Sequence, residues 1–435
     1  MNPESTDSLG PDPLIGALFP DSEWKVEWGL GRMERALEEL DAPHLQYPCL
    51  HVGGTNGKGS VASVWASVLG KAGYRTGLYT SPHLCSFRER IVVNGEPASE
   101  ARLTDVAAKL APIFSRGGLS FFEASTLLAF ECFRDAGVDV GIIEVGLGGR
   151  LDATNVVEPL VTAITNVAMD HQEYLGDSLL EIAEEKAGII KAGVPVVTAE
   201  RRPAVLEIFA SRAQAVGATL HVLDPWEDIS ALQLGPDGTR FTVRTDRWGP
   251  LSLSTPLLGA HQATNAALAV RGLEAAFPDL AAESVVEGVA SVQWPGRVQI
   301  RKTGDSLWVF DVAHNTAGVR ALSAVLADLA PPRPLILLTG ILGDKDWVQM
   351  LPPLLDAADH AIFTTPASAP RGRGWDPTAV AAEVGSGKPI EVVEEIDEAV
   401  SRAAALGVGG TVVVTGSCYT VGDALKLLGW APYGP

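Results

Sequence analysis

Gly54-Thr55-Asn56-Gly57-Lys58-Gly59-Ser60 is the stretch that decides the fold of this chain. It follows the apolar run 49–52 and precedes residues 61–71, which have a helical pattern. A glycine-rich turn between a strand and a helix directs backbone N–H groups and the helix's positive end at an anion, and Lys58 adds a mobile charge. The alternative is a structural glycine turn. Because Gly59 separates Lys58 from Ser60, the spacing differs from the common form G-x-x-x-x-G-K-S/T. We predict a nucleotide-binding loop of unusual spacing.

The composition is that of an ordinary globular protein with an acidic balance. The 435 residues are 46% hydrophobic and 20% charged, which allows two or three domains with buried cores. A formal net charge of −20 argues against a general affinity for nucleic acid or anionic membranes. No apolar run reaches the roughly 18 residues of a membrane span. We therefore expect a soluble monomer whose partners are small molecules, with neither nucleic acid nor membrane.

The N-terminal residues and the cysteines indicate a cytoplasmic protein. Residues 1–20 are polar and acidic and lack the basic and apolar regions of a signal peptide, so we expect a loose tail there. The four cysteines, Cys49, Cys85, Cys132 and Cys418, are scattered without C-x-x-C spacing. Four free thiols in a reducing cytoplasm are the simplest interpretation.

Short β-branched runs alternate with helical patterns, which is typical of parallel sheets covered by helices. The pattern predicts an α/β chain with two folded domains. Residues 21–296 would form the domain that carries the nucleotide-binding loop, with a mostly parallel sheet, and residues 297–435 a smaller open α/β domain. The first domain has strand candidates at 49–53, 76–79, 138–144, 160–166 and 195–198, and an antiparallel edge within 219–255. The second has candidates at 306–310, 335–339, 361–365, 390–393 and 411–415.

Polar residues follow several of the predicted strands. Glu144 ends a buried run, where a carboxylate is costly without a cation or a donor nearby; a salt bridge is the alternative role. The glycine-rich loop 145–155, the pair Asp170-His171 and residues 80–83 occupy similar positions. Asp170 and His171 could also be simple helix caps. Since open α/β sheets bind ligands at the carboxyl ends of their strands, we expect these groups to converge on one site, where oxygen ligands could hold Mg²⁺.

Seven motifs together resemble the folylpolyglutamate synthase and dihydrofolate synthase family, within the Mur ligase superfamily. They are residues 54–60, 80–84, 144–155, 185–189, 259–266, 294–297 and 311–315, and their order and spacing match over nearly the whole chain. The resemblance implies a P-loop ATPase domain followed by a Rossmann-like ligase domain. It also implies ATP-dependent addition of L-glutamate to tetrahydrofolate, including its polyglutamates, and to dihydropteroate. In this family the folate carboxylate attacks ATP to give an acyl phosphate, which the amine of glutamate then attacks.

The resemblance also implies roles for individual residues. Lys58, Lys186 and His314 would be catalytic, with Lys58 offsetting the repulsion between two anions. The metal ligands for Mg²⁺, as one or two ions, would be Ser81, Glu144 and His171. The ATP-binding residues would be Thr55, Asn56, Gly57, Lys58, Gly59, Ser60, Asn265, Arg297 and Asp311. Taken alone, Asp311 and His314 are equally well read as turn residues.

The roles assigned to Lys186 and to the acceptor-binding residues depend most on the resemblance. From the residues alone, Lys186 would be a helix lysine paired with a neighbouring acid; the family implies a lysine carbamylated by carbon dioxide. Phe121, Phe122, Arg150 and Asp152 are the substrate-binding candidates, since a phenylalanine can stack on a flat ring or pack in the core. His314 and Ser417 are candidates for binding glutamate. The alternatives for the whole chain are another Mur-type amino-acid ligase and a nucleotide-binding regulatory module without turnover.

Overall fold

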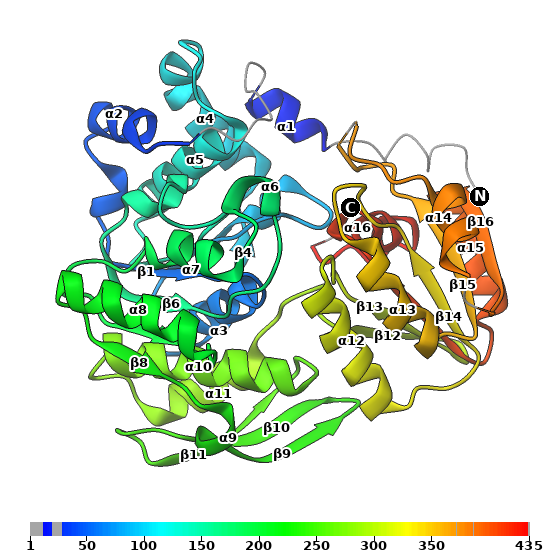
Figure 1. Cartoon of the computed structure of the whole chain (residues 1–435). Helices are drawn as coiled ribbons and strands as arrows, with labels where there is room; N and C mark the ends of the chain where they lie inside the picture. The colour runs from blue at the N-terminus through cyan, green and yellow to red at the C-terminus, as the bar shows by residue number, and fades with distance from the viewer. Residues whose placement is uncertain (1–11, 20–27, 371, 386, 434–435) are drawn as a thin grey trace.

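A computed structural model describes residues 12–19, 28–370, 372–385 and 387–433. The chain forms two α/β parts that lie side by side, the first coloured blue to green in Figure 1 and the second yellow to red. Each sheet is built from strands that are consecutive in the sequence, so each part is one continuous stretch of chain. The cleft between the two parts is therefore lined by segments far apart in the sequence.

The first part is built on an eight-stranded sheet. Its strands in spatial order are β4 (Glu96–Pro97), β3 (Ile91–Val93), β2 (Thr76–Tyr79), β5 (Val140–Glu144), β1 (Cys49–Gly53), β6 (Pro159–Ile164), β7 (Val196–Thr198) and β8 (Leu220–Val222). From β2 to β8 all neighbours are parallel, while β3 and β4 add an antiparallel edge. The central strands β1 and β5 are buried along their whole length, as expected for a parallel sheet covered on both faces.

Helices cover both faces of this sheet. On one face lie α3 (Lys58–Lys71), α10 (Ala260–Ala276) and α11 (Ala282–Ser291), whose core includes Trp65. The buried indole N–H of Trp65 donates to the carbonyl of Ala269 and so ties α3 to α10. The other face is covered by α4 (Glu100–Phe114), α5 (Phe121–Ala136), α7 (Leu179–Ala187) and α8 (Pro203–Val216). The shorter elements of this part are α2 (Gly31–Glu39), α6 (Gln172–Leu175), α9 (Pro225–Asp228), η2 (Pro43–Leu45), η3 (Phe87–Arg90) and η4 (Ala153–Val156).

The expected loose tail is partly folded. Pro13–Leu18 form the short helix α1, which is capped by the carboxylate of Asp12. The same carboxylate accepts hydrogen bonds from Ser86 and Phe87, and the Phe19 ring packs in the core that contains Phe87 and Phe121. Residues 12–19 are therefore anchored by core packing, and the expectation of a loose tail is wrong for them. Residues 1–11 and 20 lie outside the described residues.

The antiparallel segment also differs from its expected place. β8 joins the main sheet in parallel, and β9 (Ile229–Gly235), β10 (Gly238–Arg244) and β11 (Pro250–Thr255) form a separate three-stranded antiparallel sheet. The alternating pattern does predict antiparallel strands, but their apolar side chains, such as Phe241 and Leu253, pack into the α3–α10–α11 layer. Because their apolar face is buried against these helices, the three strands pack on the helices and do not extend the edge of the main sheet.

The second part is a six-stranded sheet with helices on both faces. The strand order is β12 (Gln299–Thr303), β13 (Ser306–Phe310), β17 (Thr411–Thr415), β14 (Leu335–Thr339), β15 (His360–Thr365) and β16 (Ile390–Glu395), parallel except for β12. One face carries α12 (Thr316–Leu329), α13 (Trp347–Ala357) and α14 (Pro377–Val384), and the other α15 (Ile396–Leu406) and α16 (Cys418–Leu427).

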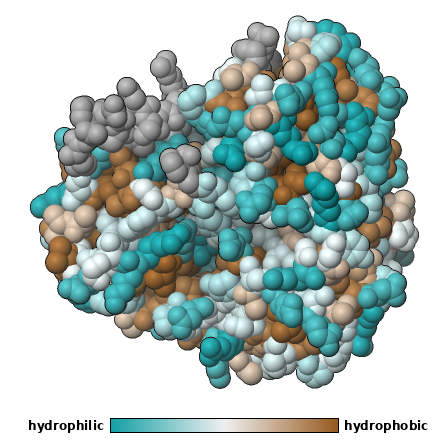
Figure 2. Space-filling model, turned by 180° about the vertical axis from the view of Figure 1, so that it is seen from behind, coloured by the Kyte–Doolittle hydropathy of each residue, from teal (hydrophilic) through white to brown (hydrophobic). Residues whose placement is uncertain are grey.

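The outer surface shows hydrophilic residues mixed with hydrophobic ones over the face seen in Figure 2. Within the described ranges, no helix has the length and apolar character needed to cross a membrane.

Candidate active site

A cavity of about 670 Å³ lies between the two parts. Its walls come from the segments that follow β1, β2, β5 and β6 in the first sheet and β13, β14 and β17 in the second. The carboxyl ends of the parallel strands are where open α/β sheets place their ligands, and here two such edges face the same space. The predicted convergence of polar strand ends is therefore present in the structure.

The phosphate loop has a backbone that only glycine accommodates at two positions. Gly54 has φ +133°, and Gly57, the N-cap of α3, has φ +88°. A Cβ at Gly54 would lie 1.9 Å from Oγ1 of Thr165, and one at Gly57 would lie 2.5 Å from Oδ1 of Asn265. The loop is thus pressed against the end of β6 and against α10, and its residues at the start of α3 line the cavity.

Gly59, the residue that makes the spacing unusual, is explained by Trp294. A Cβ at position 59 would lie 2.4 Å from Cζ2 of the Trp294 indole. Trp294 belongs to the segment between α11 and β12, where the chain passes from the first part to the second. The extra glycine lets this linking segment pack directly on the first turn of α3.

The loop is braced from the end of β6. Asn56 accepts hydrogen bonds through its carbonyl from Thr165 Oγ1 at 2.7 Å and from Asn166 Nδ2 at 2.9 Å. Thr55 accepts at Oγ1 from the N–H of Ala168 at 2.9 Å. Lys58 donates from Nζ to the Thr55 carbonyl at 3.1 Å, and that single neutral contact leaves its charge available to an anion. Thr55, Asn56, Gly57, Lys58, Gly59 and Ser60 all line the cavity.

Glu144, Ser81 and Ser60 bring oxygen atoms to the cavity wall. Glu144 is buried and accepts at Oε2 from the backbone N–H of Ser81 at 3.2 Å. Burial raises the pKa of the Glu144 carboxyl above its usual range, although Lys58 and the Ser81 N–H act in the opposite direction. The buried hydroxyl of Ser60 has no hydrogen-bond partner among the described residues. A desolvated carboxylate and an unsatisfied hydroxyl oxygen suit a hard cation such as Mg²⁺.

His171 contributes less clearly to such a site. Its backbone is in the left-handed region at φ +52°, and its Nε2 lies 3.8 Å from Oδ1 of Asp170. Burial lowers the pKa of His171 to about 4, so the ring is neutral at pH 7. Within the described ranges, no group of three or more His, Cys, Asp and Glu side chains is placed to hold a metal ion. The metal roles of Ser81, Glu144 and His171 stay predictions.

The side chain of Lys186 is buried. Its side chain projects from α7 into the cavity wall and donates from Nζ to the Gly54 carbonyl at 3.0 Å. Burial, together with the nearby charge of Lys58, lowers the pKa of Lys186 to about 7. The alternative interpretation, a helix lysine paired with a neighbouring acid, is wrong because the partner of the buried side chain is a backbone carbonyl. A large fraction of Lys186 is thus a neutral amine at neutral pH.

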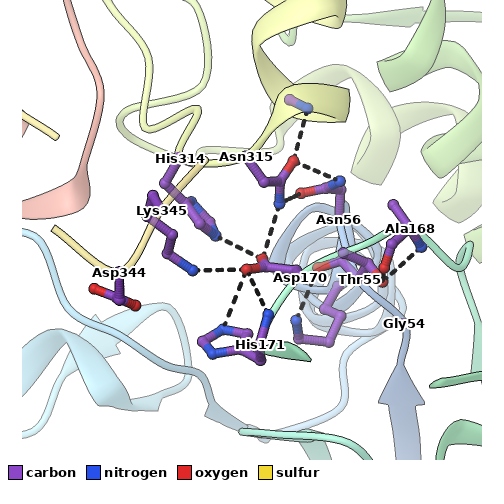
Figure 3. Close-up of polar contacts among 12 residues, drawn as sticks. Gly54, Thr55, Asn56, Ala168, Asp170, His171, His314, Asn315, Asp344 and Lys345 are labelled. Carbon is purple, nitrogen blue, oxygen red and sulfur yellow. Dashed lines mark hydrogen bonds and ion pairs between the residues drawn. The ribbon is translucent and has the colours of Figure 1, made fainter. Parts of the chain in front are cut away.

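Three side chains of the second part contact Asp170 of the first (Figure 3). Its Oδ1 accepts from Lys345 Nζ at 2.6 Å, and its Oδ2 accepts from Asn315 Nδ2 at 2.9 Å and faces His314 Nε2 at 3.5 Å. Burial by itself would raise the pKa of the Asp170 carboxyl, but the hydrogen bond and charges of His314, His171 and Lys345 outweigh it and hold that pKa below its usual range. Asp170 is therefore a buried anion held by the second part.

The predicted nucleotide contacts of the second part lie on the same cavity. Asp311 follows β13 and accepts from the N–H groups of Val298 and Ala313, each at 2.9 Å. Arg297 is half-buried with its guanidinium 5.9 Å from the centre of the Trp294 ring. Asn265, Arg297, Asp311 and His314 all line the cavity, opposite or beside the phosphate loop. Their binding roles stay predictions.

The acceptor-side candidates divide between the cavity and the surface. Phe122 lines the cavity and lies over Gly146, where a Cβ would come 2.3 Å from the ring. Phe121 also lines it but belongs mostly to the aromatic core. Asp152 is buried and accepts from the N–H groups of Leu147 and Thr154, which shapes the glycine-rich loop.

Arg150 is not brought to the site. It is exposed, pairs with Glu185 at 2.7 Å and does not line the cavity.

Arg90 is a cavity residue that sequence reasoning missed. It is buried between the rings of Phe87 and Phe121, at 5.8 and 5.3 Å from their centres, and donates from Nε to His83 at 2.9 Å. Among the described residues it has no carboxylate partner. Glu144 acts on Arg90 only through the longer-range attraction of its charge, so the buried guanidinium can still pair directly with the carboxylate of a ligand. The only available signal was its place after the predicted 80–84 motif.

The fold and this nucleotide cleft define an ATP-dependent ligase of the Mur type. Residues 52–272 match the Mur ligase middle domain, and residues 296–418 match the glutamate ligase domain of Mur ligases. Among curated proteins, the dihydrofolate synthase/folylpolyglutamate synthase of Bacillus subtilis is 34% identical over 93% of this chain and 95% of its own length. The chain belongs to the folylpolyglutamate synthase/dihydrofolate synthase family, as the sequence motifs predict.

Solved structures give the same result. The Mycobacterium tuberculosis folylpolyglutamate synthase complexed with ADP has a TM-score of 0.87 and 32% identity, covering 98% of this chain and 99% of that one. The Escherichia coli FolC in complex with DHPP and ADP has a TM-score of 0.85 and 30% identity, covering 96% of this chain and 97% of that one.

Proposed function

We propose that this chain uses ATP to ligate L-glutamate to tetrahydrofolate, including its polyglutamates, and to dihydropteroate, releasing ADP and phosphate. One observation carries the proposal: the phosphate loop and the buried Glu144, Lys186 and Arg90 all line one cavity between two domains. The relatives support it, because one family structure contains ADP and another contains ADP with DHPP.

The reaction needs an activated carboxyl group, since a carboxylate shares its negative charge over both oxygens and is a poor electrophile. An oxygen of the acceptor carboxylate bonds to the γ-phosphorus of ATP as the bond to ADP breaks, which gives an acyl phosphate. The amine of glutamate then attacks the acyl carbon and loses a proton, and phosphate leaves. The loop N–H groups and Lys58 hold the phosphates and offset the charge that accumulates as the two anions meet.

Ser81, Glu144 and His171 would hold Mg²⁺, one ion or two, with Ser60 close to the phosphates. When bound, the ion neutralises phosphate charge and fixes the geometry of the transferring group. The chain itself contributes a carboxylate that is already desolvated and oriented. Glu144 is buried, and one of its oxygens accepts a hydrogen bond from the Ser81 N–H.

The acceptor lies toward Phe122, Asp152 and Arg90 in this proposal. The half-buried Phe122 ring offers a face for a flat pterin, and Arg90 offers a guanidinium for a carboxylate. Glutamate binds nearer the second domain, by His314 and Ser417. Ser417 lines the cavity at the N-cap of α16.

Lys186 is carbamylated in the working enzyme. Carbon dioxide reacts with a neutral amine, and the burial of Lys186 provides one near pH 7. The product is an anion, which suits a position beside bound cations better than a second ammonium next to Lys58.

A coupled assay of ADP release tests this function. Dihydropteroate and tetrahydrofolate are compared as acceptors, each with and without L-glutamate, and the product is identified by mass. We expect ADP release that requires both an acceptor and glutamate, and products one glutamyl unit heavier. If neither pterin acceptor supports ADP release, the proposal is overturned in favour of another amino-acid ligase, and nucleotide binding without turnover would indicate a regulatory module.

A further inference from the structure

One carboxylate of the first domain holds three side chains of the second. Asp170, which follows β6, accepts hydrogen bonds from Lys345 and Asn315 and faces His314 (Figure 3). These partners lie on the loops after β13 and β14, 145 and 175 positions away for Asn315 and Lys345. Asp170 is thus a point at which the two domains are joined.

The ion pair at this point is enclosed. The side chains of Asp170 and Lys345 are each only 7% exposed. Their attraction is stronger than that of a surface pair, and removal of one partner leaves a buried charge without compensation. If the two domains separate, water reaches the remaining charge. Removal of either partner therefore shifts the balance from the closed toward the open arrangement.

Asn315 extends the connection to the phosphate loop. It donates from Nδ2 to Asn56 Oδ1 at 3.0 Å, and its Oδ1 accepts from Asn56 Nδ2 at 3.3 Å. The same oxygen accepts the N–H of Gly318 in the first turn of α12 at 2.8 Å. All four hydrogen-bonding positions of the Asn315 amide are used. The phosphate loop, the start of α12 and Asp170 consequently hold one fixed relative position.

His314 is oriented by the same carboxylate. Its Nδ1 lies 2.9 Å from the Val312 carbonyl, which can only accept, so Nδ1 carries a proton. Its Nε2 faces Asp170 Oδ2, and the ring is fixed between these two oxygens. Asp170 thereby sets the direction of a side chain that lines the cavity.

We propose that Asp170 is a positioning residue for the ligase: its carboxylate latches the second domain onto the phosphate loop and holds Lys345 and His314 at the cavity. The kinetic part of this inference rests on the proposed function. The contact by which Asp170 holds the second domain is called the latch below. Its effect on domain closure can be measured without turnover.

The kinetic test is a double-mutant cycle of Asp170→Asn and Lys345→Met. We expect each single variant to lower kcat about ten-fold or more, with a smaller change in the KM for ATP, since ATP is gripped mainly by the first domain. In the Lys345→Met background, Asp170→Asn should lower kcat by a factor several-fold smaller than in the wild type, because the two changes break the same contact. The matched control is Asp344→Asn, which removes the 2.6 Å pair with Arg373 inside the second domain and should keep kcat within about two-fold.

Small-angle X-ray scattering supplies the structural test, with the free proteins and with AMPPCP. Asp170→Asn should have a larger radius of gyration than the wild type, whereas Asp344→Asn should match it. If Asp170→Asn does not fold, Lys345→Met carries the same comparison from the other domain.

Three results would overturn the latch: wild-type kcat in Asp170→Asn, fully additive effects in the cycle, or lost turnover with an unchanged radius of gyration. The last would make Asp170 only a local support for His171, whose N–H it accepts at 3.0 Å. If the wild type shows no turnover, the proposed function fails, but the scattering still decides the latch.

Discussion

At the scale of single residues, burial converts ordinary side chains into reactive ones. Lys186 on a solvated helix would be an ammonium ion over the whole physiological range. Here it is 3% exposed and meets a backbone carbonyl instead of an acid. Desolvation disfavours its charged form, and Lys58 adds repulsion, so its pKa falls to about 7.

This pKa gives a prediction about carbamylation. Enzyme depleted of carbon dioxide should lose activity and regain it when carbon dioxide is restored at a fixed dissolved concentration. The neutral amine is the reacting form, and it is depleted as pH falls through about 7. The rate of reactivation should therefore rise with pH up to about 7 and then level off, and Lys186→Arg should not respond. A rate that keeps climbing toward pH 10 would show an amine with an ordinary lysine pKa and contradict the account.

What the sequence did not show depends on contacts between distant residues. Asp170 was expected at a strand end, with a helix cap as the alternative, but its contacts with Asn315 and Lys345 were not, because those partners lie 145 and 175 positions away. Arg90 gave little signal beyond its place after the 80–84 motif, because its interest comes from the lack of a hydrogen-bonded carboxylate among the described residues of the folded chain. Glu144, Lys58 and His314 could be predicted since each stands at a strand end or in a motif of fixed spacing.

At the scale of elements, α3 shows what the unusual spacing requires. Its first turn packs under the Trp294 indole at Gly59, while a Cβ added at Gly70, near its other end, would meet no atom within 4 Å. The two glycines therefore serve different purposes in one helix. Only the first links the phosphate loop to the segment between the domains.

Replacing each of the two glycines by alanine tests these two roles separately. Gly59→Ala forces a methyl against the Trp294 ring and should destabilise the protein by about 1–3 kcal/mol and raise the KM for ATP. Gly70→Ala, the matched control, should be neutral or stabilising by up to about 1 kcal/mol, because alanine is the better helix former. Thermal unfolding and ATP kinetics measure both. Equal behaviour of the two variants would mean that the Trp294 contact does not explain the spacing.

Burial explains many of the elements that could be predicted, although the short buried strand β3 was missed. β1, β2, β13, β14 and β17 agree with the predicted strand bounds, because they are apolar runs in the interior of a sheet. β12 and β4 were missed: they are edge strands with largely exposed residues and no apolar run. α1 was missed because six residues are too few for a visible helical period, and its buried side chains Ile15 and Leu18 pack in a core built by residues distant in the sequence.

At the scale of the whole molecule, the site exists only between two domains. The phosphate loop, Glu144 and Lys186 come from the first, and Asp311, His314 and Lys345 from the second. The order of strands along the chain was enough to predict two α/β domains. The boundary at 296/297 stays a prediction. How the domains meet was not predictable, because it is set by a few side-chain contacts such as Asp170 with Lys345.

The central claim is that this shared site joins glutamate to a folate carboxylate through an acyl phosphate. The most direct measurement uses an acceptor whose reacting carboxylate is labelled with ¹⁸O, followed by mass analysis of the phosphate released. Since the acyl oxygen leaves with the phosphorus, the account predicts one ¹⁸O atom transferred to phosphate in each turnover. Phosphate that contains no label while the amide forms would contradict it.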